Sequence, residues 1–297
     1  MSSGSRDAGE DDGNADARPP FAGDSTADAL IEHRVSGEQV FAGALLDVRR
    51  DRVCLPDGGD AIREYVVHPG AVLMVPVQDD GRLVVVRQFR YPPNRTFIEF
   101  PAGKLDPGES PLATAMRELV EEAGYEALHW TRLGVVHPVI AYSTEAIEIY
   151  VARGLVHVGA RLEPGEFLEV ASCTEPELYA ALDEGRLTDA KTVSAMLLYA
   201  RWTAAPQRSI RVRITGSVQG VGYRDWMRRR AGSRVVGWVR NRRDGSVEAF
   251  LQGPREACDS LVDACGHGPP ASRVTRIETA PCAFDPALTT FEQRSSA

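Results

Sequence analysis

The alternation of apolar and polar residues divides the chain into segments with different structural expectations. Residues 1–30 consist mostly of Asp, Gly, Ser and Ala, and because they carry few large apolar side chains we expect a disordered acidic tail. From His33 onward, β-branched residues alternate with polar ones and predict a hairpin followed by three strands, REYVVHP, AVLMVPV and RLVVVRQF. Asp79-Asp80-Gly81 predicts a tight hairpin turn between the last two strands.

Helical periodicity begins within the segment GKLDPGESPLATAMRELVEEAGY, residues 103–125. Ser110 can cap the helix, Pro111 suits its first turn, and Gly124 provides the stop. One face is predicted to be apolar and consists of Leu112, Met116, Leu119, Val120 and Ala123. The opposite face is acidic and consists of Glu118, Glu121 and Glu122. Because like charges at this spacing repel each other, we expect a cation or a basic partner to compensate them.

Two interpretations of the acidic face are open at this point. A solvated helix face is the usual explanation for a Glu-Glu pair, whereas a hard divalent metal would compensate all three charges. Oxygen ligands without nearby His or Cys favour Mg²⁺ or Mn²⁺ over zinc. Such ions usually accompany a substrate that carries phosphate. The spacing of the flanking residues favours the metal.

The defined residues resemble the box of Nudix hydrolases: Gly103, five residues, Glu109, seven residues, Arg117-Glu118-Leu119, one residue, Glu121-Glu122, one residue, Gly124-Tyr125. The resemblance implies an α/β/α sandwich that hydrolyses a nucleoside diphosphate linked to another group. Glu118 and Glu122, at i and i+4, would hold the metal, while Glu121 would share a second metal or assist the base. The box residues with structural roles would be Gly103, Glu109, Arg117 and Gly124, with Glu109 and Arg117 pairing to hold the loop against the helix.

The segment RQFRYPPNRTFIEFPAGK narrows the resemblance to the ADP-ribose pyrophosphatase group, with Arg87 among the matching positions. This resemblance implies that Arg90 contacts substrate phosphate and that Glu99 lies beside the metal site. The carbonyl of Ala102 would ligate one metal. A surface salt bridge is the alternative role for Arg90.

The sequence after the box also resembles this group, with one departure. LGVVHPVIAYSTEAIEIYVARGL predicts strands around a connection that contains Pro138 and residues 142–145. Relatives often have Pro-Gly before the aromatic-Ser-x-Glu segment, whereas this chain has Ile140-Ala141. Substrate choice is therefore less firmly predicted than reaction type.

An acidic loop and two helices complete the first domain, which we expect to span residues 31–203. In this group a loop glutamate is thought to activate the attacking water, and within RLEPGEFLEV the candidates are Glu166 first and Glu163 second. Either could instead be a solvated loop charge. EPELYAALDEGRLTDAKTVSAMLLYARW predicts two helices separated by Gly185.

Periodicity stops in a short polar connection, which places a linker at residues 204–209 and a second domain at residues 210–297. Residues 210–214 alternate as a strand, and a Gly-rich turn leads from it into a helix. Glycines at such a turn allow backbone N–H groups to approach an anion at a helix N-terminus. This turn alone is a weak signal.

Further motifs make the second domain resemble acylphosphatase, namely GWVRN at 237–241, Asp244-Gly245, SVEAFLQG, Gly268-Pro269-Pro270 and FEQR at 291–294. The resemblance implies a ferredoxin-like βαββαβ sandwich. Arg224 would grip phosphate and Asn241 would orient water. The loop would bind phosphate through its amides at Gln219, Gly220, Val221, Gly222 and Tyr223. No metal is required, since placement and charge stabilisation suffice for a good leaving group. Between Arg224 and Gly237 the chain is about one residue shorter than typical relatives.

Charge and composition limit the remaining possibilities. The net charge of the chain is −8. From Pro206 onward there are 15 Arg and 9 acidic residues, a net charge of +6, so the part before Pro206 has a net charge of −14. Nucleic-acid binding is a rival explanation for the arginines, but no aromatic-interleaved basic motif accompanies them.

The five cysteines form no CxxC pair and predict reduced thiols. No run approaches the roughly 18 apolar residues of a membrane span, and the first residues lack the basic-then-apolar order of a signal peptide, so we expect a cytoplasmic protein without membrane contact.

The sequence thus predicts an α+β enzyme of two domains that acts on small phosphate compounds. The first domain would use Mg²⁺ or Mn²⁺ to hydrolyse a nucleoside diphosphate sugar, with ADP-ribose giving AMP and ribose 5-phosphate. The second would hydrolyse acyl phosphates without a cofactor. The alternative is a Nudix hydrolase for another nucleotide joined to a non-catalytic, anion-binding regulatory module. A homodimer through the first domain is implied by the resemblance alone.

Overall fold

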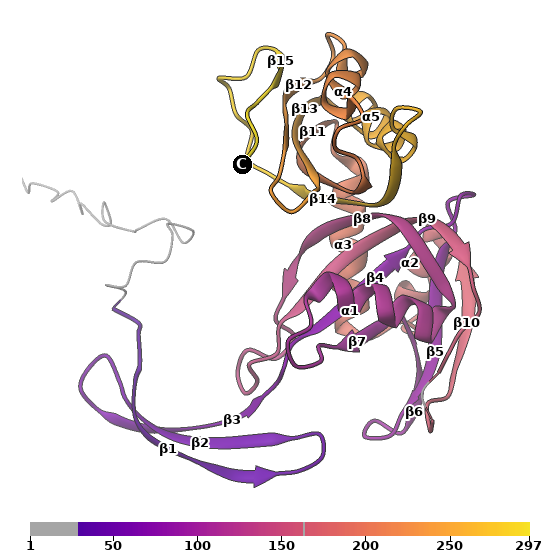
Figure 1. The fold of residues 1–297 in the computed structure, drawn as a ribbon. Helices are drawn as coiled ribbons and strands as arrows, with labels where there is room; N and C mark the ends of the chain where they lie inside the picture. Colours follow the sequence, from indigo (N-terminus) through magenta and orange to yellow (C-terminus); the bar gives the residue numbers. More distant parts are fainter. Residues whose placement is uncertain (1–28, 163) are drawn as a thin grey trace, which may run out of the picture.

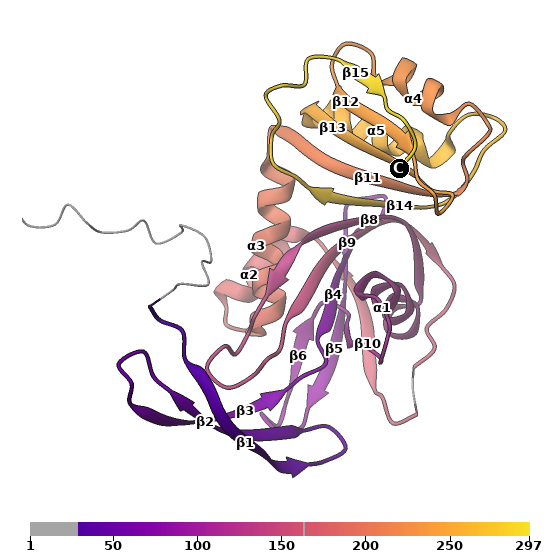
Figure 2. The same ribbon diagram turned by 60° about the vertical axis from the view of Figure 1, so that its left-hand side comes forward.

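The structure is a computed structural model that describes residues 29–162 and 164–297. The tail predicted for residues 1–30 therefore lies outside the described residues except at its last two positions. Figures 1 and 2 show two bodies stacked on each other and a separate small sheet beside the first body. No helix in the described ranges has the length and apolar character that crossing a membrane requires. All five cysteines are free thiols.

The small sheet comes first in the chain and consists of three antiparallel strands, β1 (His33–Ala42), β2 (Asp47–Cys54) and β3 (Asp60–Val67). The predicted hairpin forms β1 and β2, and REYVVHP adds the third strand. Every residue of β1 is exposed, including Val35 and Phe41. In Figure 1 this sheet extends away from the first body, and Val66 of β3 connects the two through hydrogen bonds with Tyr142 O and Thr144 N.

The first body contains strands in two sheets. One consists of β5 (Leu83–Arg90), β6 (Arg95–Glu99) and β10 (Leu168–Cys173). The other contains β4 (Ala71–Pro76), β7 (Ala102–Lys104), β8 (Tyr125–Val136) and β9 (Ile147–His157). The predicted turn is present, since Gln78 N donates to Arg82 O at 2.8 Å. However, β4 and β5 share only the Val77–Leu83 bridge and then enter different sheets.

Helices cover both faces of these sheets, as the predicted α/β/α sandwich requires. On one face lie α1 (Pro111–Glu118) and the π-helical turn η1 (Leu119–Ala123), and on the other α2 (Glu175–Asp183) and α3 (Ala190–Ala204). Strand β4 is buried on both faces, because Val72 and Met74 pack in the α1 cluster while Leu73 and Val75 pack in the α2–α3 cluster. Its continuous apolar run reflects this double burial.

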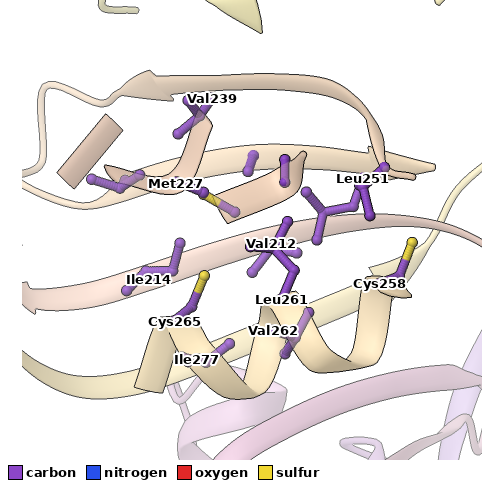
Figure 3. Packing of buried hydrophobic residues seen from close by; sticks show 14 of the residues in the cluster. Val212, Ile214, Met227, Val239, Leu251, Cys258, Leu261, Val262, Cys265 and Ile277 are labelled. Atoms are coloured by element: carbon purple, nitrogen blue, oxygen red, sulfur yellow. The ribbon is translucent and has the colours of Figure 1, made fainter. Parts of the chain in front are cut away.

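The second body has the predicted βαββαβ order, with the strands at β11 (Gln207–Ser217), β12 (Val236–Asn241), β13 (Val247–Pro254) and β14 (Arg273–Pro281). Its helices are α4 (Tyr223–Ala231) and α5 (Arg255–His267), and a short β15 (Phe291–Gln293) pairs with β12. Along β11, Ile210, Val212 and Ile214 enter the core shown in Figure 3, so Arg211 and Arg213 face the opposite side. Neither α4 nor α5 packs on that side of the sheet, because both belong to the core cluster on the other side.

The two bodies share one sheet. Strand β14 pairs with β8 in parallel, which joins their strands into a nine-stranded sheet. The hydroxyls of Thr131 and Thr279 lie 2.7 Å apart in the buried contact, and Arg153 lies 3.7 Å from Asp263 across it. Helix α3 ends at Ala204 and β11 begins at Gln207, three residues before the predicted start of the second domain.

Candidate active sites

Helix α1 and η1 carry the acidic motif, and their ends form as predicted. The Ser110 side chain accepts a hydrogen bond from Ala113 N at 3.3 Å, and Gly124 ends the segment with φ 74°. The π-helical turn was not predicted. Because a π turn is wider than an α turn, it changes the direction of the residues within it. Glu122 is consequently buried, at 5% exposure, instead of lying on the solvent face, and Val120 is absent from the apolar cluster.

Arg117 connects three carboxylates at the start of this acidic segment. Its Nη2 lies 3.0 Å from Glu109 Oε2, which is the predicted loop-to-helix pair. Its Nη1 also contacts Glu118 Oε1 and Glu121 Oε2, each at 2.8 Å. The hydrogen bond from Arg117 holds the pKa of Glu109 below its ordinary value. Arg117 thus holds the loop at Glu109 against the helix and also pairs with Glu118 and Glu121.

Glu122 has a different environment from its acidic neighbours. Its Oε2 accepts a hydrogen bond from Ala102 N at 2.9 Å. Burial raises the pKa of Glu122 to about 8; the Ala102 N–H opposes this shift, while the charges of Glu118 and Glu166 reinforce it. Burial likewise raises the pKa of Glu118. The backbone of the predicted ligand Ala102 is therefore beside Glu122, and the acidic wall carries charge that its protein neighbours do not fully compensate.

Gly103 has a steric role in this arrangement. A Cβ atom built on Gly103 would overlap the carboxyl group of Glu118. Glycine at this position leaves room for the Glu118 side chain beside β7. The structural role predicted for Gly103 has this physical basis.

A second wall of the site is built from basic residues and one buried carboxylate. Arg90 donates two hydrogen bonds to Glu99, at 2.8 and 2.7 Å, and Lys191 contacts the same carboxylate. Glu99 is 2% exposed. Burial alone would raise the pKa of Glu99, but Arg90 and Lys191 outweigh it and hold the pKa below its ordinary value. Arg90 therefore has the salt bridge that was its alternative role, although it remains partly exposed.

A cavity of about 580 Å³ is lined by residues of both groups. Its lining includes the predicted residues Arg90, Ala102, Gly103, Arg117, Glu118, Glu121, Glu122 and Glu166. Glu99 is not among the lining residues but bonds to Arg90 and Lys191, which are, and Glu163 lies outside the described residues. Sequence reasoning missed Lys191, Gln88, His68, Lys104, Asp106 and Glu145, which also line the cavity. Lys191 follows the helix cap Asp189, and no local signal distinguishes it from a surface lysine.

The donor set of the acidic wall fits a hard divalent cation. Glu118, Glu121, Glu122 and Glu166 offer only carboxylate oxygens, the ligands that Mg²⁺ and Mn²⁺ prefer. In the described part of the chain, no three His, Cys, Asp or Glu side chains converge as a ready-made metal site. The ion pairs to Arg117 account for this, because they hold Glu118 and Glu121 on the guanidinium.

The C-terminal body carries a second anion-binding arrangement after β11. Gly220 and Gly222 have φ of 75° and 74°, left-handed conformations that glycine adopts without strain. Among the described residues, none accepts a hydrogen bond from the backbone N–H groups of residues 219–222. The Gln219 side chain fixes the loop by donating to Arg242 O and Ser246 O, both at 2.8 Å. The loop therefore presents unpaired amides at the start of α4.

Side chains of the same loop point into the protein. Val221 packs against the hydrophobic core, and the buried Tyr223 donates to Cys265 O at 2.6 Å. Only the backbone of Val221 and Tyr223 is therefore available to an anion. The substrate-binding prediction for these two residues applies to their amides and not to their side chains.

Arg224 and Asn241 both contact the C-terminal segment of the chain. Arg224 Nη1 donates to Arg294 O at 3.4 Å, while Asn241 O accepts a hydrogen bond from Ala297 N at 3.0 Å. Ala297 O accepts a further hydrogen bond from Arg243 N at 2.9 Å. The last residues of the chain thus lie beside both candidate catalytic residues, a feature that sequence reasoning missed.

Comparison with known proteins identifies both bodies. Family models match residues 67–196 (NUDIX domain), 210–293 (Acylphosphatase) and 32–66 (Nucleoside diphosphate sugar hydrolase N-terminal domain). The chain is 37% identical over 170 residues to an ADP-ribose pyrophosphatase of Bacillus subtilis, covering 57% of this chain and 92% of that protein. It is 44% identical over 90 residues to an acylphosphatase of Rhodospirillum rubrum, covering 30% of this chain and 98% of that protein. The chain belongs to the Nudix and acylphosphatase families.

A solved structure titled as an ADP compounds hydrolase matches the Nudix part with a TM-score of 0.54 and 26% sequence identity. The match covers 59% of this chain and 96% of that structure. The protein is therefore an enzyme that joins an ADP-ribose pyrophosphatase-like Nudix hydrolase to an acylphosphatase domain. The cavity and the loop after β11 are the candidate active sites of these two domains.

Proposed function

We propose that the Nudix domain hydrolyses ADP-ribose to AMP and ribose 5-phosphate with Mg²⁺ or Mn²⁺, and that the acylphosphatase domain hydrolyses an acyl phosphate without a metal. The cavity with an acidic and a basic wall is the observation that carries the first activity. Its volume lies within the range of small-molecule sites. The B. subtilis relative, named an ADP-ribose pyrophosphatase, supports this substrate.

The two walls suit the opposite charges of a metal and a pyrophosphate. A divalent ion held by Glu118 and Glu122 would neutralise the pyrophosphate and lower the pKa of a bound water. Arg90 and Lys191 face this wall and would bind phosphate oxygens. Glu166 also lines the cavity, and its carboxylate would accept the proton of the attacking water. Glu121 would share a second metal or assist the catalytic base.

The acylphosphatase domain offers a different chemistry. The amides of residues 219–223 and the Arg224 guanidinium would bind the phosphate oxygens, and Asn241 would orient water. Arg224 would exchange its hydrogen bond to Arg294 O for phosphate oxygens. An acyl phosphate has a good leaving group, so placement and charge stabilisation are sufficient.

Assays of the full-length protein test both activities. ADP-ribose, NADH and an acyl phosphate are each incubated with Mg²⁺, with Mn²⁺ or with EDTA. We expect ADP-ribose turnover only with metal and acyl phosphate turnover in all three conditions. Cleavage of NADH with a kcat/KM more than tenfold above that for ADP-ribose would contradict the substrate assignment. Phosphate binding without acyl phosphate turnover would favour a regulatory role for the second domain.

We also propose a homodimer through the Nudix part. The β1–β3 sheet exposes apolar side chains, among them Val35 at 54%, Phe41 at 55% and Ile62 at 56%. Exposed apolar patches on soluble proteins commonly mark interfaces. Light scattering on the eluting protein should give about twice the mass of 32.3 kDa, and a monomer at all concentrations would contradict the proposal.

A further inference from the structure

A second cavity, of about 340 Å³, lies where the acylphosphatase sheet meets the Nudix domain. Its lining comes from β11, β13 and β14, on the face away from α4 and α5, and from β8, β9 and α1; Figure 2 shows β14 and β8 at this junction. Its lining residues include Leu112, Trp130, Arg132, Arg211, Arg242 and Glu248. Neither the loop after β11 nor the glutamates of the Nudix cavity contribute to it.

Positive charge exceeds negative charge on the acylphosphatase side of this cavity. Glu248 is 3% exposed and is shared by three guanidinium groups. Arg240 makes the close contact at 2.7 Å, whereas Arg242 and Arg211 lie at 3.5 and 3.6 Å. Arg240 satisfies the carboxylate, so Arg211 and Arg242 retain donors for another anion.

Asp244 provides only part of the missing negative charge. It pairs with Arg213 at 2.7 Å and lies 3.4 Å from Arg242. Together with the Glu248 group, four arginines are therefore shared between two carboxylates. A surplus of two positive charges remains at the cavity, and a partly desolvated surplus of this kind attracts an anion.

Residues around the rest of the cavity do not cancel this surplus. Arg132 pairs with Glu148 at 2.7 Å, and Tyr150 donates to the same carboxylate at 3.0 Å. Glu278 pairs with Arg276 at 2.9 Å. These pairs are neutral, so the excess charge stays with the arginines of the acylphosphatase sheet.

The cavity also has an apolar surface beside its arginines, contributed by Leu112, Trp130, Tyr150 and Ala280. A phosphate alone would leave this surface without a partner, whereas a ring joined to a phosphate would contact both parts. We propose that this interdomain cavity binds a nucleoside monophosphate, with its phosphate at Arg211 and Arg242 and its ring against Leu112 and Ala280. The proposal is independent of the reactions assigned to the two catalytic sites.

Calorimetric titration of the full-length protein with AMP in EDTA tests the site. A Lys191→Met/Arg224→Gln background weakens phosphate binding at both catalytic sites, because it removes one phosphate-binding cation from each, and we expect AMP binding to persist in it. Adding Arg211→Gln and Arg242→Gln should lower the affinity at least tenfold, about 1.4 kcal/mol. Arg201→Gln, which removes an exposed arginine of α3, is the matched control and should leave the affinity unchanged.

Two further measurements complete the test. Circular dichroism should show that the Arg211/Arg242 variant folds, because Glu248 keeps Arg240. Inorganic phosphate and adenosine serve as separate probes, and each should bind more weakly than AMP. AMP affinity that survives the Arg211/Arg242 substitution, or that disappears in the Lys191→Met/Arg224→Gln background, would overturn the proposal. Equal affinity for AMP and inorganic phosphate would overturn the assignment of the ring.

Discussion

The two candidate active sites would bind phosphate through different parts of the chain. In the Nudix cavity the groups that would act are charged side chains, and the acidic wall includes Glu118 and Glu122. In the acylphosphatase domain the groups are mainly backbone amides at the start of α4, with Arg224 beside them. The glutamates of the Nudix cavity carry negative charge that a metal can neutralise. The backbone amides of the acylphosphatase loop supply partial positive charge to phosphate directly.

Burial affects the two sites in opposite ways. Removing Glu122 from water raises its pKa, so the Nudix wall is electrostatically costly without a cation. The acylphosphatase loop has no comparable cost, because Val221 and Tyr223 bury apolar groups and Gln219 bonds two carbonyls. Removing the Glu122 carboxylate should therefore lower activity without lowering stability. Substitutions in the acylphosphatase loop should bring no such gain in stability.

The largest expected effect is that of Glu122→Gln. Losing the carboxylate should reduce metal-dependent ADP-ribose hydrolysis about 1000-fold, about 4 kcal/mol of transition-state stabilisation. Acyl phosphate hydrolysis should stay unchanged, since the acylphosphatase loop lies in the other domain. The glutamine can still accept the Ala102 N–H and carries no charge, so the metal-free protein should melt at an equal or higher temperature. Parallel assays and a thermal melt in EDTA check this, and unchanged ADP-ribose turnover would remove Glu122 from the metal site.

A smaller loss is expected for Arg224→Ala, about 100-fold in acyl phosphate hydrolysis, because one positioned donor to the phosphate is removed. Lysine at this position should rescue poorly, since a single ammonium cannot reproduce the two-pronged guanidinium. Metal-dependent hydrolysis should be unaffected. Exposed Arg201→Ala is the control for general loss of positive charge. Equal activity of the alanine and wild-type proteins would exclude Arg224 from the site.

Lys191 tests the basic wall of the Nudix cavity. Lys191→Met should raise the KM for ADP-ribose about tenfold, about 1.4 kcal/mol, with a smaller change in kcat, because the lost group binds phosphate in both ground and transition states. The variant should fold, since Glu99 keeps its two hydrogen bonds to Arg90. A lower kcat at constant KM would instead indicate that Lys191 acts only in the transition state.

Local patterns predicted most of the elements and the acidic face, for identifiable reasons. The cap at Ser110, the stop at Gly124 and the spacing of the glutamates are all encoded within a few residues. The π-helical turn that buries Glu122 has no comparable local signal. Lys191 reaches Glu99 from 92 residues away, and a contact of that separation depends on how the helices pack on the sheets.

The pairing of the two domains is likewise not predictable from local sequence patterns. Strand β14 and strand β8 each have the alternation of an ordinary strand, and nothing local indicates that they pair. Their pairing creates the interdomain cavity with Arg211 and Leu112, which belong to different domains. Sites inside one motif were therefore predictable, whereas a site between two motifs required the structure.

His129 lies at this junction between the two domains. It is paired with Ile277 of β14, and its buried Nδ1 has no hydrogen-bond partner among the described residues. Burial lowers the pKa of His129; the charges of Arg153 and His267 lower it further, and Asp263 opposes them. The folded protein therefore disfavours the imidazolium at the contact between the domains.

The smallest expected effect is a change in how stability depends on pH. A histidine in an unfolded chain takes up its proton near pH 6.5, whereas folded His129 does so at lower pH. Its contribution to stability is thus complete above about pH 6.5 and is lost as the pH falls from there through the lowered pKa of the folded protein. Thermal melts between pH 8 and pH 5 should show a shallower decline for His129→Gln than for the wild type. His137→Gln, which changes an exposed histidine outside the junction, should leave the wild-type slope. Identical slopes for His129→Gln and wild type would show that protonation of His129 does not contribute to the loss of stability at low pH.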